Sequence, residues 1–391
     1  MGRMLPSAAM NRPRLSGRAL FVLVGALALR ARAALWEDPL WALSGQASAT
    51  GGYDSNLFAV NEGPGDAFAS FKPALDLVRK DALLSFDAEA WVDWTTFLKQ
   101  TGSDATDPGV RMSLSYPANV ETWTTQSAEA HWIRTTAVNV DVGQRVRRED
   151  VLARYEGDLV DTGKTSLVGR VLLDRDEFLG AAFDTIGTAS LGATADYSPH
   201  DLFRAGLGYD LTLGRSQPNS PGLAALDRTE HAFTMQAQGE FTPKVTGRVS
   251  LGTAYSDYTG SFRHSEWDMV AGADVAWRPT ERLVLNLQAV RAPSFNADGD
   301  VDVSTSVILE VRQNLGRGYS IRADAQGGRT THERRVTYRT DAIEGAGIAA
   351  DYGLTEKLTA SAGYDWTRQD SDVSRYTYRR HVVTGQLKYR F

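Results

Sequence analysis

The chain of 391 residues contains no cysteine, which excludes disulfide scaffolds, zinc ribbons and thiol enzymes. It also lacks an excess of positive charge, because 42 basic residues stand against 48 acidic ones, and a net charge of −6 argues against a nucleic-acid partner. Long apolar runs are missing beyond residue 33, where no stretch approaches the ~20 residues that a transmembrane helix needs. A helical membrane protein is therefore excluded, while 42% hydrophobic residues exclude a disordered chain.

The N-terminus has the layout of a secretory signal peptide. A basic leader precedes the apolar residues 19–29, and Ala31-Arg32-Ala33 offers a cleavage site. An anchor helix is the rival reading, but eleven apolar residues span only ~16 Å of a ~30 Å hydrocarbon core. We expect a signal peptide over residues 1–33 and a mature chain over 34–391. Its removal takes away six arginines and no acid, so the mature charge falls from −6 to −12.

The mature chain repeats an alternating pattern of apolar and polar residues. In residues 84–94, Leu84, Phe86 and Ala88 point one way while Ser85 and Asp87 point the other. A period of two is typical of a strand with one apolar and one polar face. Short turns are expected near residues 79–81, 117–119, 161–164, 199, 243, 279, 315–318 and 353–357. Longer polar connections are expected at residues 54–65, 98–108, 134–150, 175–184, 214–228, 258–265, 293–300, 330–335 and 368–375.

Tight turns that alternate with long loops are typical of outer-membrane barrels. Each of the eight short turns joins two strands into a hairpin, which gives sixteen strands. One further strand before the first hairpin and one after the last bring the total to about 18. Alternation is weak over residues 137–164, so 16 strands also fit. A propeller would show more uniformly apolar central strands, and lipid requires a closed sheet because it offers no partner to free edge groups. The sequence therefore predicts an all-β fold, a transmembrane antiparallel up-and-down β-barrel in the bacterial outer membrane, surrounded by outer-membrane lipid.

Aromatic residues and the C-terminus support the same prediction. Aromatic side chains fall on the apolar face near strand ends, where interfacial girdles lie. The final strand alternates as far as Phe391, and a terminal phenylalanine resembles the sorting signal that the barrel-assembly machinery reads. The aromatic residues concerned are Tyr197, Tyr255, Trp267, Trp277, Tyr352, Tyr364 and Trp366.

The first predicted hairpin carries a family resemblance. Residues 52–58, Gly-Tyr-Asp-Ser-Asn-Leu-Phe, with the polar loop and strand that follow them, are similar to the opening of the family called "putative β-barrel porin 2", some members of which are linked to exopolysaccharide systems. The resemblance implies a barrel of 16 to 18 strands that serves in surface-polysaccharide export or as a general channel. It brings no catalytic residues.

The polar faces of the strands predict a hydrophilic lining. A barrel of about sixteen or more strands is wide enough for water, and an excess of acid would favour cations or neutral sugars over anions. We therefore expect a porin-like channel for small hydrophilic solutes or polysaccharide. The alternative is a non-conducting surface protein whose loops bind a partner or glycan and close the pore. The expected pore-lining residues are Asp87, Glu89, Asp93, Arg111, Arg154, Arg204, Asp210, Glu240, Arg248, Asp268, Asp274, Glu310 and Arg312.

We expect no enzyme, no cofactor and no metal. His264 and His332 fall in predicted outer loops beside acids, where histidines are usually solvated, and no sequence motif of a hydrolase, P-loop or zinc protease occurs. Residues 296–302 place oxygen ligands around a glycine as calcium loops do, but the distal glutamate is absent. An ordinary hairpin loop is the preferred interpretation of that segment.

Overall fold

The computed structural model describes residues 35–81, 83–117, 125–139, 144–179, 183–200, 202–219, 225–259, 264–296, 301–333 and 338–391. The predicted signal peptide lies outside the described residues and stays a prediction. No helix in the described part of the chain is long and apolar enough to cross a membrane.

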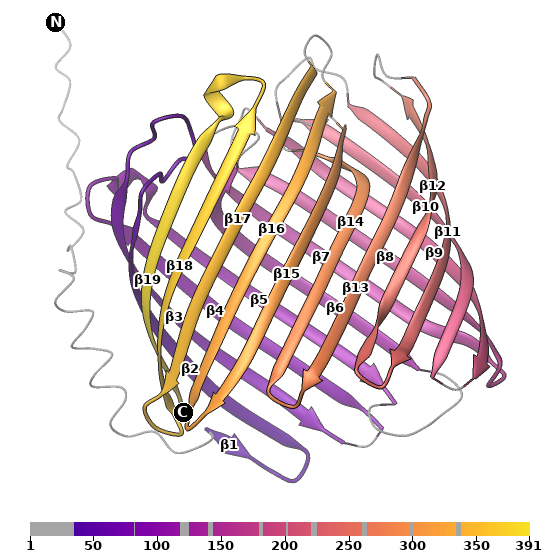
Figure 1. The fold of residues 1–391 in the computed structure, drawn as a ribbon, viewed down its shortest axis with the longest axis horizontal. Coiled ribbons are helices and arrows are strands. Elements are labelled where there is room, and N and C mark those ends of the chain that lie inside the picture. The colour runs from indigo at the N-terminus through magenta and orange to yellow at the C-terminus, as the bar shows by residue number, and fades with distance from the viewer. Residues whose placement is uncertain are drawn as a thin grey trace, which may run out of the picture.

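The described residues form one closed antiparallel barrel of eighteen strands (Figure 1), so the predicted fold class and the higher strand count are confirmed. Each strand pairs with its neighbours in the sequence, as in any up-and-down barrel. The strands are β2 (Trp41–Asp54), β3 (Asp66–Lys80), β4 (Ser85–Phe97), β5 (Ala105–Tyr116), β6 (Gln126–Asn139), β7 (Gln144–Asp161), β8 (Thr165–Leu179), β9 (Asp184–His200), β10 (Phe203–Pro218), β11 (Leu226–Thr242), β12 (Val245–Thr259), β13 (Glu266–Thr280), β14 (Leu283–Phe295), β15 (Val301–Gly316), β16 (Tyr319–Glu333), β17 (Tyr338–Gly353), β18 (Leu358–Ser371) and β19 (Tyr378–Arg390).

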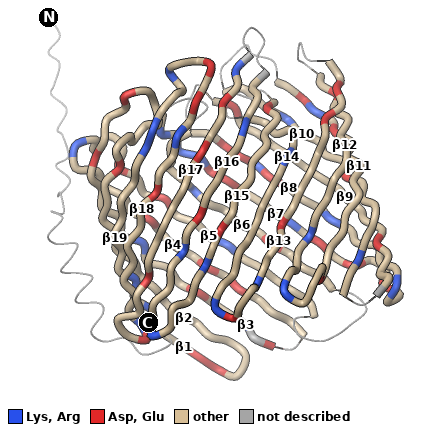
Figure 2. The backbone as a smooth tube through the Cα atoms, in the orientation of Figure 1, with Lys and Arg blue, Asp and Glu red and all other residues tan. Residues whose placement is uncertain are grey.

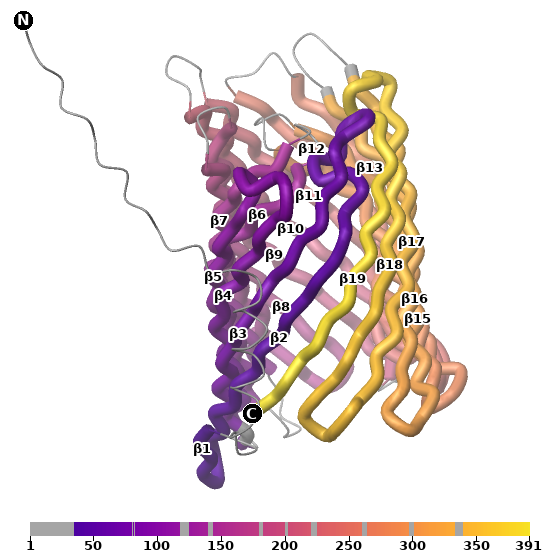
Figure 3. Tube along the Cα trace, turned by 90° about the vertical axis from the view of Figure 1, so that its left-hand side faces the viewer, coloured from indigo at the N-terminus to yellow at the C-terminus, as the bar shows by residue number. Residues whose placement is uncertain are grey.

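The barrel closes between its first and last long strands. β19 pairs with β2 from Arg390 opposite Gln46 to Val382 opposite Asp54. Phe391 and Gly45 extend this ladder with two backbone hydrogen bonds of 2.8 Å. The short strand β1 (Trp36–Glu37) folds back on the start of β2 and was not predicted. In Figure 3 the C-terminus and β1 lie at the same end of the barrel, which is also the end with the short turns.

Most connections at one end are short turns, and the longest connection, residues 55–65, lies at the other end, as the sequence predicted. Two connections depart from this pattern: residues 117–125 between β5 and β6 are more than a short turn, and only residues 140–143 separate β6 from β7. The turn between β15 and β16 shows how the local sequence sets a tight reversal. Gly316, Arg317 and Gly318 all have positive φ, at 78°, 52° and 80°. Glycine reaches this region without the steric cost that a side chain brings. We call the two ends of the barrel the short-turn end and the long-loop end.

Several of the predicted long connections are wrong in extent, because the strands run further than predicted: residues 175–179 belong to β8, 214–218 to β10 and 330–333 to β16. The loop expected at residues 134–150 is largely strand, because β6 runs to Asn139 and β7 starts at Gln144. This part of β7 carries charges on both faces, so it lacks the alternation of a half-buried strand. The loop expected at residues 98–108 ends at Asp104, because Pro108 lies within β5 opposite Val92. Proline had favoured a loop there, since it cannot donate to a strand ladder.

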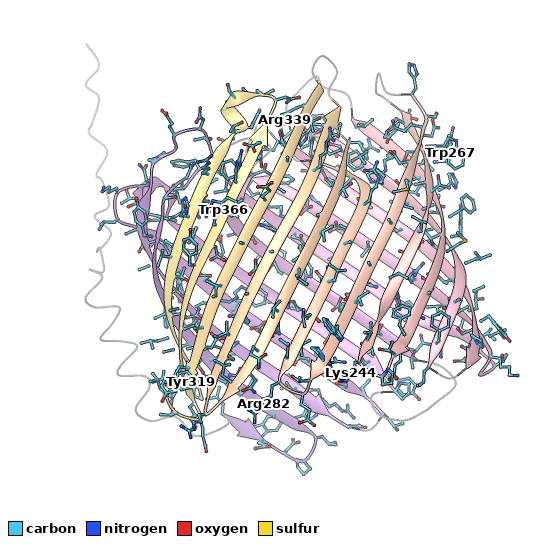
Figure 4. The ribbon with its side chains drawn as sticks, viewed as in Figure 1. Lys244, Trp267, Arg282, Tyr319, Arg339 and Trp366 are labelled. Carbon is cyan, nitrogen blue, oxygen red and sulfur yellow. The ribbon has the colours of Figure 1, made fainter. Side chains whose placement is uncertain are left out.

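The outer face is apolar and carries aromatic side chains near both ends. Trp267, 64% exposed, packs against Tyr255 near the long-loop end with the two rings tilted by 49°, while Tyr319 stacks on Tyr352 at the short-turn end. Figure 4 shows Trp267 and Tyr319 at these opposite ends. All seven aromatic residues predicted for the apolar face share it in the strand register, which matches the girdles of a membrane barrel.

Candidate functional site: the barrel interior

Contacts that skip a strand identify the inner face of the barrel. Arg170 on β8 reaches Asp210 on β10 at 3.1 Å, across the intervening β9. Gln236 on β11 donates to Asp196 on β9 at 3.0 Å in the same way. Side chains converge on the concave side of a curved sheet and diverge on its convex side. These polar residues therefore face the lumen, and the apolar alternates face outward.

All thirteen predicted pore-lining residues lie on this inner face. Residues that lie directly opposite each other on neighbouring strands point to the same side of the sheet, so the pairing register assigns each strand's inner residues. Examples are Glu89 opposite Arg111 and Arg248 opposite Asp274. The set also contains Asp87 and Asp93 on β4, Arg154 on β7, Arg204 and Asp210 on β10, Glu240 on β11, Asp268 on β13, and Glu310 and Arg312 on β15. Whether they line an open passage stays a prediction. Figure 2 shows charged residues along the whole height of the wall.

One wall of the lumen is acidic, and although Arg111 lies opposite Glu89 in the ladder, its carboxylates form no ion pair within the described residues. Asp76 on β3 lies directly opposite Glu89, and Asp93 lies directly opposite Asp107 on β5. Like charges that face each other across a ladder destabilise a sheet. Within the described residues no basic side chain forms an ion pair with these four carboxylates or with Asp87. Glu89 instead accepts a hydrogen bond from Gln46. We call Asp76, Asp87, Glu89, Asp93 and Asp107 the acidic wall.

The wall from β7 to β12 is different, because its charges compensate one another. Arg170 contacts both carboxylate oxygens of Asp210, at 3.1 and 3.2 Å. Arg204 lies 3.6 Å from Asp161, and Arg248 lies 3.8 Å from Glu156. The last pair joins β12 to β7, which are five strands apart. The sheet must therefore bend sharply here so that its inner faces approach each other.

Apolar side chains fill part of the long-loop end. Val146, Phe178, Phe183 and Ile186 form a buried cluster at the ends of β7, β8 and β9, and Phe295 packs against it from the end of β14. Phe295 also covers the inward-facing Gly214, where an added Cβ would lie 2.5 Å from its ring. The cluster thus connects walls that are several strands apart and narrows the lumen.

A buried charged cluster lies at the same end, on β15 to β18. His332 Nδ1 is 2.6 Å from Asp302, and its Nε2 is 3.0 Å from Asp341. Arg339 contacts Asp341 at 3.0 Å and stacks on Tyr376, 3.9 Å from the ring centre. Figure 4 shows Arg339 at the long-loop end. His332 is only 1% exposed, so its predicted placement in a solvated loop is wrong. β16 continues to Glu333, beyond the apolar band of the outer face. Its last residues are polar, and for this reason they resembled a loop in the sequence.

The connection between β2 and β3 is also folded rather than extended. Leu57 and Ala59 are each 1% exposed, although they belong to a predicted polar loop. Asn56 donates to the backbone carbonyl of Arg379 at 3.2 Å, and the amide of Ser55 donates to that of His381 at 2.9 Å. The loop is therefore held against β19. Sequence reasoning missed this, because the apolar residues 57–60 form a short continuous run without the alternation that marks a strand.

No metal centre emerges from the described residues, where no group of three or more histidine, aspartate or glutamate side chains could hold an ion. The predicted calcium-like segment falls mostly on residues 297–300, outside the described residues. Its flanking Asn296 donates to Asp302 at 2.9 Å. His264, the other loop histidine considered, lies just before β13.

Closed strands, an apolar outer surface with aromatic girdles and a polar interior define an outer-membrane-type β-barrel. A family model described as "Putative beta-barrel porin 2" matches residues 209–391, from β10 to the C-terminus. The predicted resemblance is confirmed for this part of the chain. The match does not include residues 52–58, which had suggested it, although Tyr209-Asp210 and Tyr364-Asp365 repeat part of that sequence.

Solved structures with a similar fold include two receptors and an iron transporter. A mutant of the ferric enterobactin receptor PfeA from Pseudomonas aeruginosa is 11% identical, with 89% of this chain and 80% of that chain covered and a TM-score of 0.44. The siderophore receptor PirA from Acinetobacter baumannii is 9% identical, with 89% and 80% covered and a TM-score of 0.45. The FrpB iron transporter of Neisseria meningitidis is 10% identical, with 88% and 65% covered and a TM-score of 0.45. No curated protein matches the chain.

Proposed function

We propose that this protein is a water-filled channel of the bacterial outer membrane that prefers cations and neutral solutes to anions. The acidic wall is the observation that carries the proposal. Asp76 faces Glu89 and Asp93 faces Asp107, and none of the four forms an ion pair with a basic side chain in the described part of the chain. Unpaired carboxylates are too costly for a dry interior, so water must hydrate them. A hydrated, negatively charged lining attracts cations.

Two partners follow from the same architecture. Outer-membrane lipid would contact the apolar outer face and its aromatic girdles. The barrel-assembly machinery would read the final strand, in which Phe391 packs on Gly45; an added Cβ there would lie 2.3 Å from the phenylalanine ring. The family resemblance also suggests surface-polysaccharide export, for which the polar lining supplies hydrogen-bonding groups.

The filled long-loop end supports a second candidate, a non-conducting surface protein. The Phe295 contact narrows the mouth that would face the outside, and the connection at Leu57 is folded against β19 at the same end. In that case the loops themselves, rather than the lumen, would meet a partner or glycan.

Planar bilayers with a salt gradient distinguish the two candidates. For the channel we expect discrete conductance steps with potassium chloride, and a reversal potential of the sign that marks potassium as more permeant than chloride. An anion-selective reversal potential would contradict the proposed selectivity. No conductance, either from the wild type or from a variant lacking residues 56–64, would favour the non-conducting surface protein.

A further inference from the structure

A small polar pocket lies inside the barrel at the short-turn end. It is lined by residues of β5 to β12, including Ser115 at the end of β5 and Gln126 at the start of β6, and has a volume of about 330 Å³. Pockets for small molecules have volumes of about 300–1,000 Å³, so this one suits a small ligand. Its walls carry arginine, carboxylate, amide and hydroxyl groups, among them Arg248, Asp196, Gln236 and Thr194.

Glycines on β9 and β10 make room for this pocket. A Cβ added to Gly206 would lie 2.0 Å from Asp196 Oδ1, and one added to Gly192 would lie 2.0 Å from Asp210 Oδ1. The polar side chains therefore lie directly over the backbone of the neighbouring strand. Side chains at these two positions would displace the carboxylates.

The arginines of the pocket already have partners. Arg170, Arg204 and Arg248 each face a carboxylate, on Asp210, Asp161 and Glu156 respectively. An added anion would therefore meet arginines that are already paired, and it would be repelled by Asp158 and Asp196, which also line the pocket and form no ion pair in the described part of the chain. The balance favours a ligand without negative charge that can donate hydrogen bonds.

Two buried polar atoms in the pocket wall have no partner. Asp196 is 4% exposed, and its Oδ1 accepts from Gln236 while its Oδ2 has no hydrogen bond among the described residues. Thr194, 1% exposed and two residues earlier on the same face of β9, has an unpartnered Oγ1. Buried polar groups are nearly always hydrogen-bonded, so each unsatisfied one calls for an explanation.

A second hairpin of the same barrel provides an internal comparison. Residues 195–212 of β9–β10 and residues 350–367 of β17–β18 share Ala-Asp-Tyr at the start and Gly-Tyr-Asp-x-Thr at the end, at the same spacing. In the second hairpin Asp351 accepts from Ser361 at 2.6 Å and lies 3.5 Å from Arg322.

The first hairpin lacks the groups that satisfy Asp351. Gly206 occupies the position of Ser361, so no hydroxyl reaches Asp196 from β10. Thr194 occupies the position of Ala349, which adds a hydroxyl beside the open carboxylate oxygen. The carboxylate of Asp351 in β17–β18 is therefore satisfied by neighbouring side chains. In β9–β10 the corresponding Asp196 Oδ2 and the added hydroxyl of Thr194 have no hydrogen-bond partner among the described residues.

We propose that the pocket binds a neutral polyhydroxylated solute, a single sugar ring, at Thr194 and Asp196. Adjacent ligand hydroxyls can donate to Asp196 Oδ2 and accept from Thr194 Oγ1, because a hydroxyl both donates and accepts. The inference rests on the proposed channel and names a solute class for it. Its test requires only the folded barrel and no conductance.

The experiment measures binding of D-glucose to the purified full-length barrel by isothermal titration calorimetry, in a detergent without a sugar headgroup. We expect saturable binding. Asp196→Asn should weaken it by about 10-fold or more, because hydrogen bonds to charged groups are the stronger ones, and Thr194→Val by about two- to tenfold. The matched controls Asp351→Asn and Thr384→Val, on the far wall, should change the affinity less than about twofold. Heat-dependent mobility in SDS gels shows that each variant is folded.

Several results would overturn the inference. These are no saturable glucose binding by the wild type, an equal loss in Asp351→Asn and Asp196→Asn, or inorganic phosphate binding more tightly than glucose. If glucose does not bind but the bilayer experiment shows a cation-selective channel, only the sugar site is wrong. If glucose binds and no variant conducts, only the channel is wrong.

Discussion

Charged side chains at the long-loop end are buried and paired, whereas those of the acidic wall are accessible and unpaired. His332, Arg339 and Asp341 are at most 5% exposed and contact one another directly. Asp87 and Asp93 are not buried, and no described basic residue pairs with them. Burial removes water, so charges must find protein partners there. Where they do not, water is required to hydrate them, and this requirement is the basis of the proposed channel.

The largest expected effect comes from breaking the buried cluster. Arg339→Met would leave Asp341 with a weakened set of partners in a dry site, and breaking a buried pair costs about 3–5 kcal/mol. The matched control is Arg322→Met, because Arg322 pairs with Asp351 at 3.5 Å but is 50% exposed. An exposed pair contributes about 0–1 kcal/mol. Urea unfolding of the two variants in detergent measures the difference, and equal losses of stability would contradict the comparison.

The next effect concerns the narrowed mouth. Phe295 packs on the cluster around Phe178 and covers Gly214. Phe295→Ala should widen this constriction and raise the single-channel conductance by roughly twofold, because pore dimensions control ion flow. Phe233→Ala, an outward-facing substitution at 51% exposure, is the control and should leave conductance unchanged. An unchanged conductance for Phe295→Ala would show that the constriction lies elsewhere.

A smaller effect is expected from the acidic wall. Neutralising Asp87, Glu89 and Asp93 together, as D87N, E89Q and D93N, should reduce the preference for potassium over chloride by about fivefold, since one charge at ~4 Å in water is worth ~1 kcal/mol. The paired double variant R170Q and D210N removes one charge of each sign and should leave the reversal potential nearly unchanged. If both variants shift it equally, lumen charge does not set selectivity.

Local pattern made most of the barrel predictable. The alternation at residues 84–94 became β4, and most short turns lie within a few residues of the predicted positions, although Pro199 and Pro279 belong to β9 and β13 and the turn predicted at residues 117–119 falls mostly outside the described residues. These features depend on neighbours in the chain, which a period of two or a Pro-Thr turn reveals. The inward direction of Asp87 and Arg248 followed for the same reason.

Features that depend on distant strands were not predictable. Arg248 and Glu156 meet because the sheet bends between β7 and β12, and neither residue has a local signal for that pairing. The sequence placed His332 in a solvated loop. Its burial arises from a cluster with Asp302, Asp341 and Tyr376, which lie on other segments of the chain and leave no local signal around His332. Asp196 was not singled out, since its open oxygen reflects the absence of a side chain at Gly206.

The smallest expected effect lies outside the lumen, in the turn between β3 and β4. Asp81 accepts hydrogen bonds from the amides of Leu83 and Leu84, at 2.7 and 3.4 Å, and from Arg79 at 2.9 Å. These bonds hold the pKa of Asp81 below its usual value, the amide of Leu83 contributing most. A lowered pKa means that this stabilisation is present above the usual carboxyl range and is lost as the pH falls through the folded value. Asp81→Asn should therefore remove a small part of the acid dependence of stability while leaving conductance and selectivity at neutral pH unchanged. Urea unfolding at a series of pH values from acidic to neutral measures this change in stability. A change in ion selectivity would contradict the prediction, because it would mean that a turn outside the lumen influences the charges inside it.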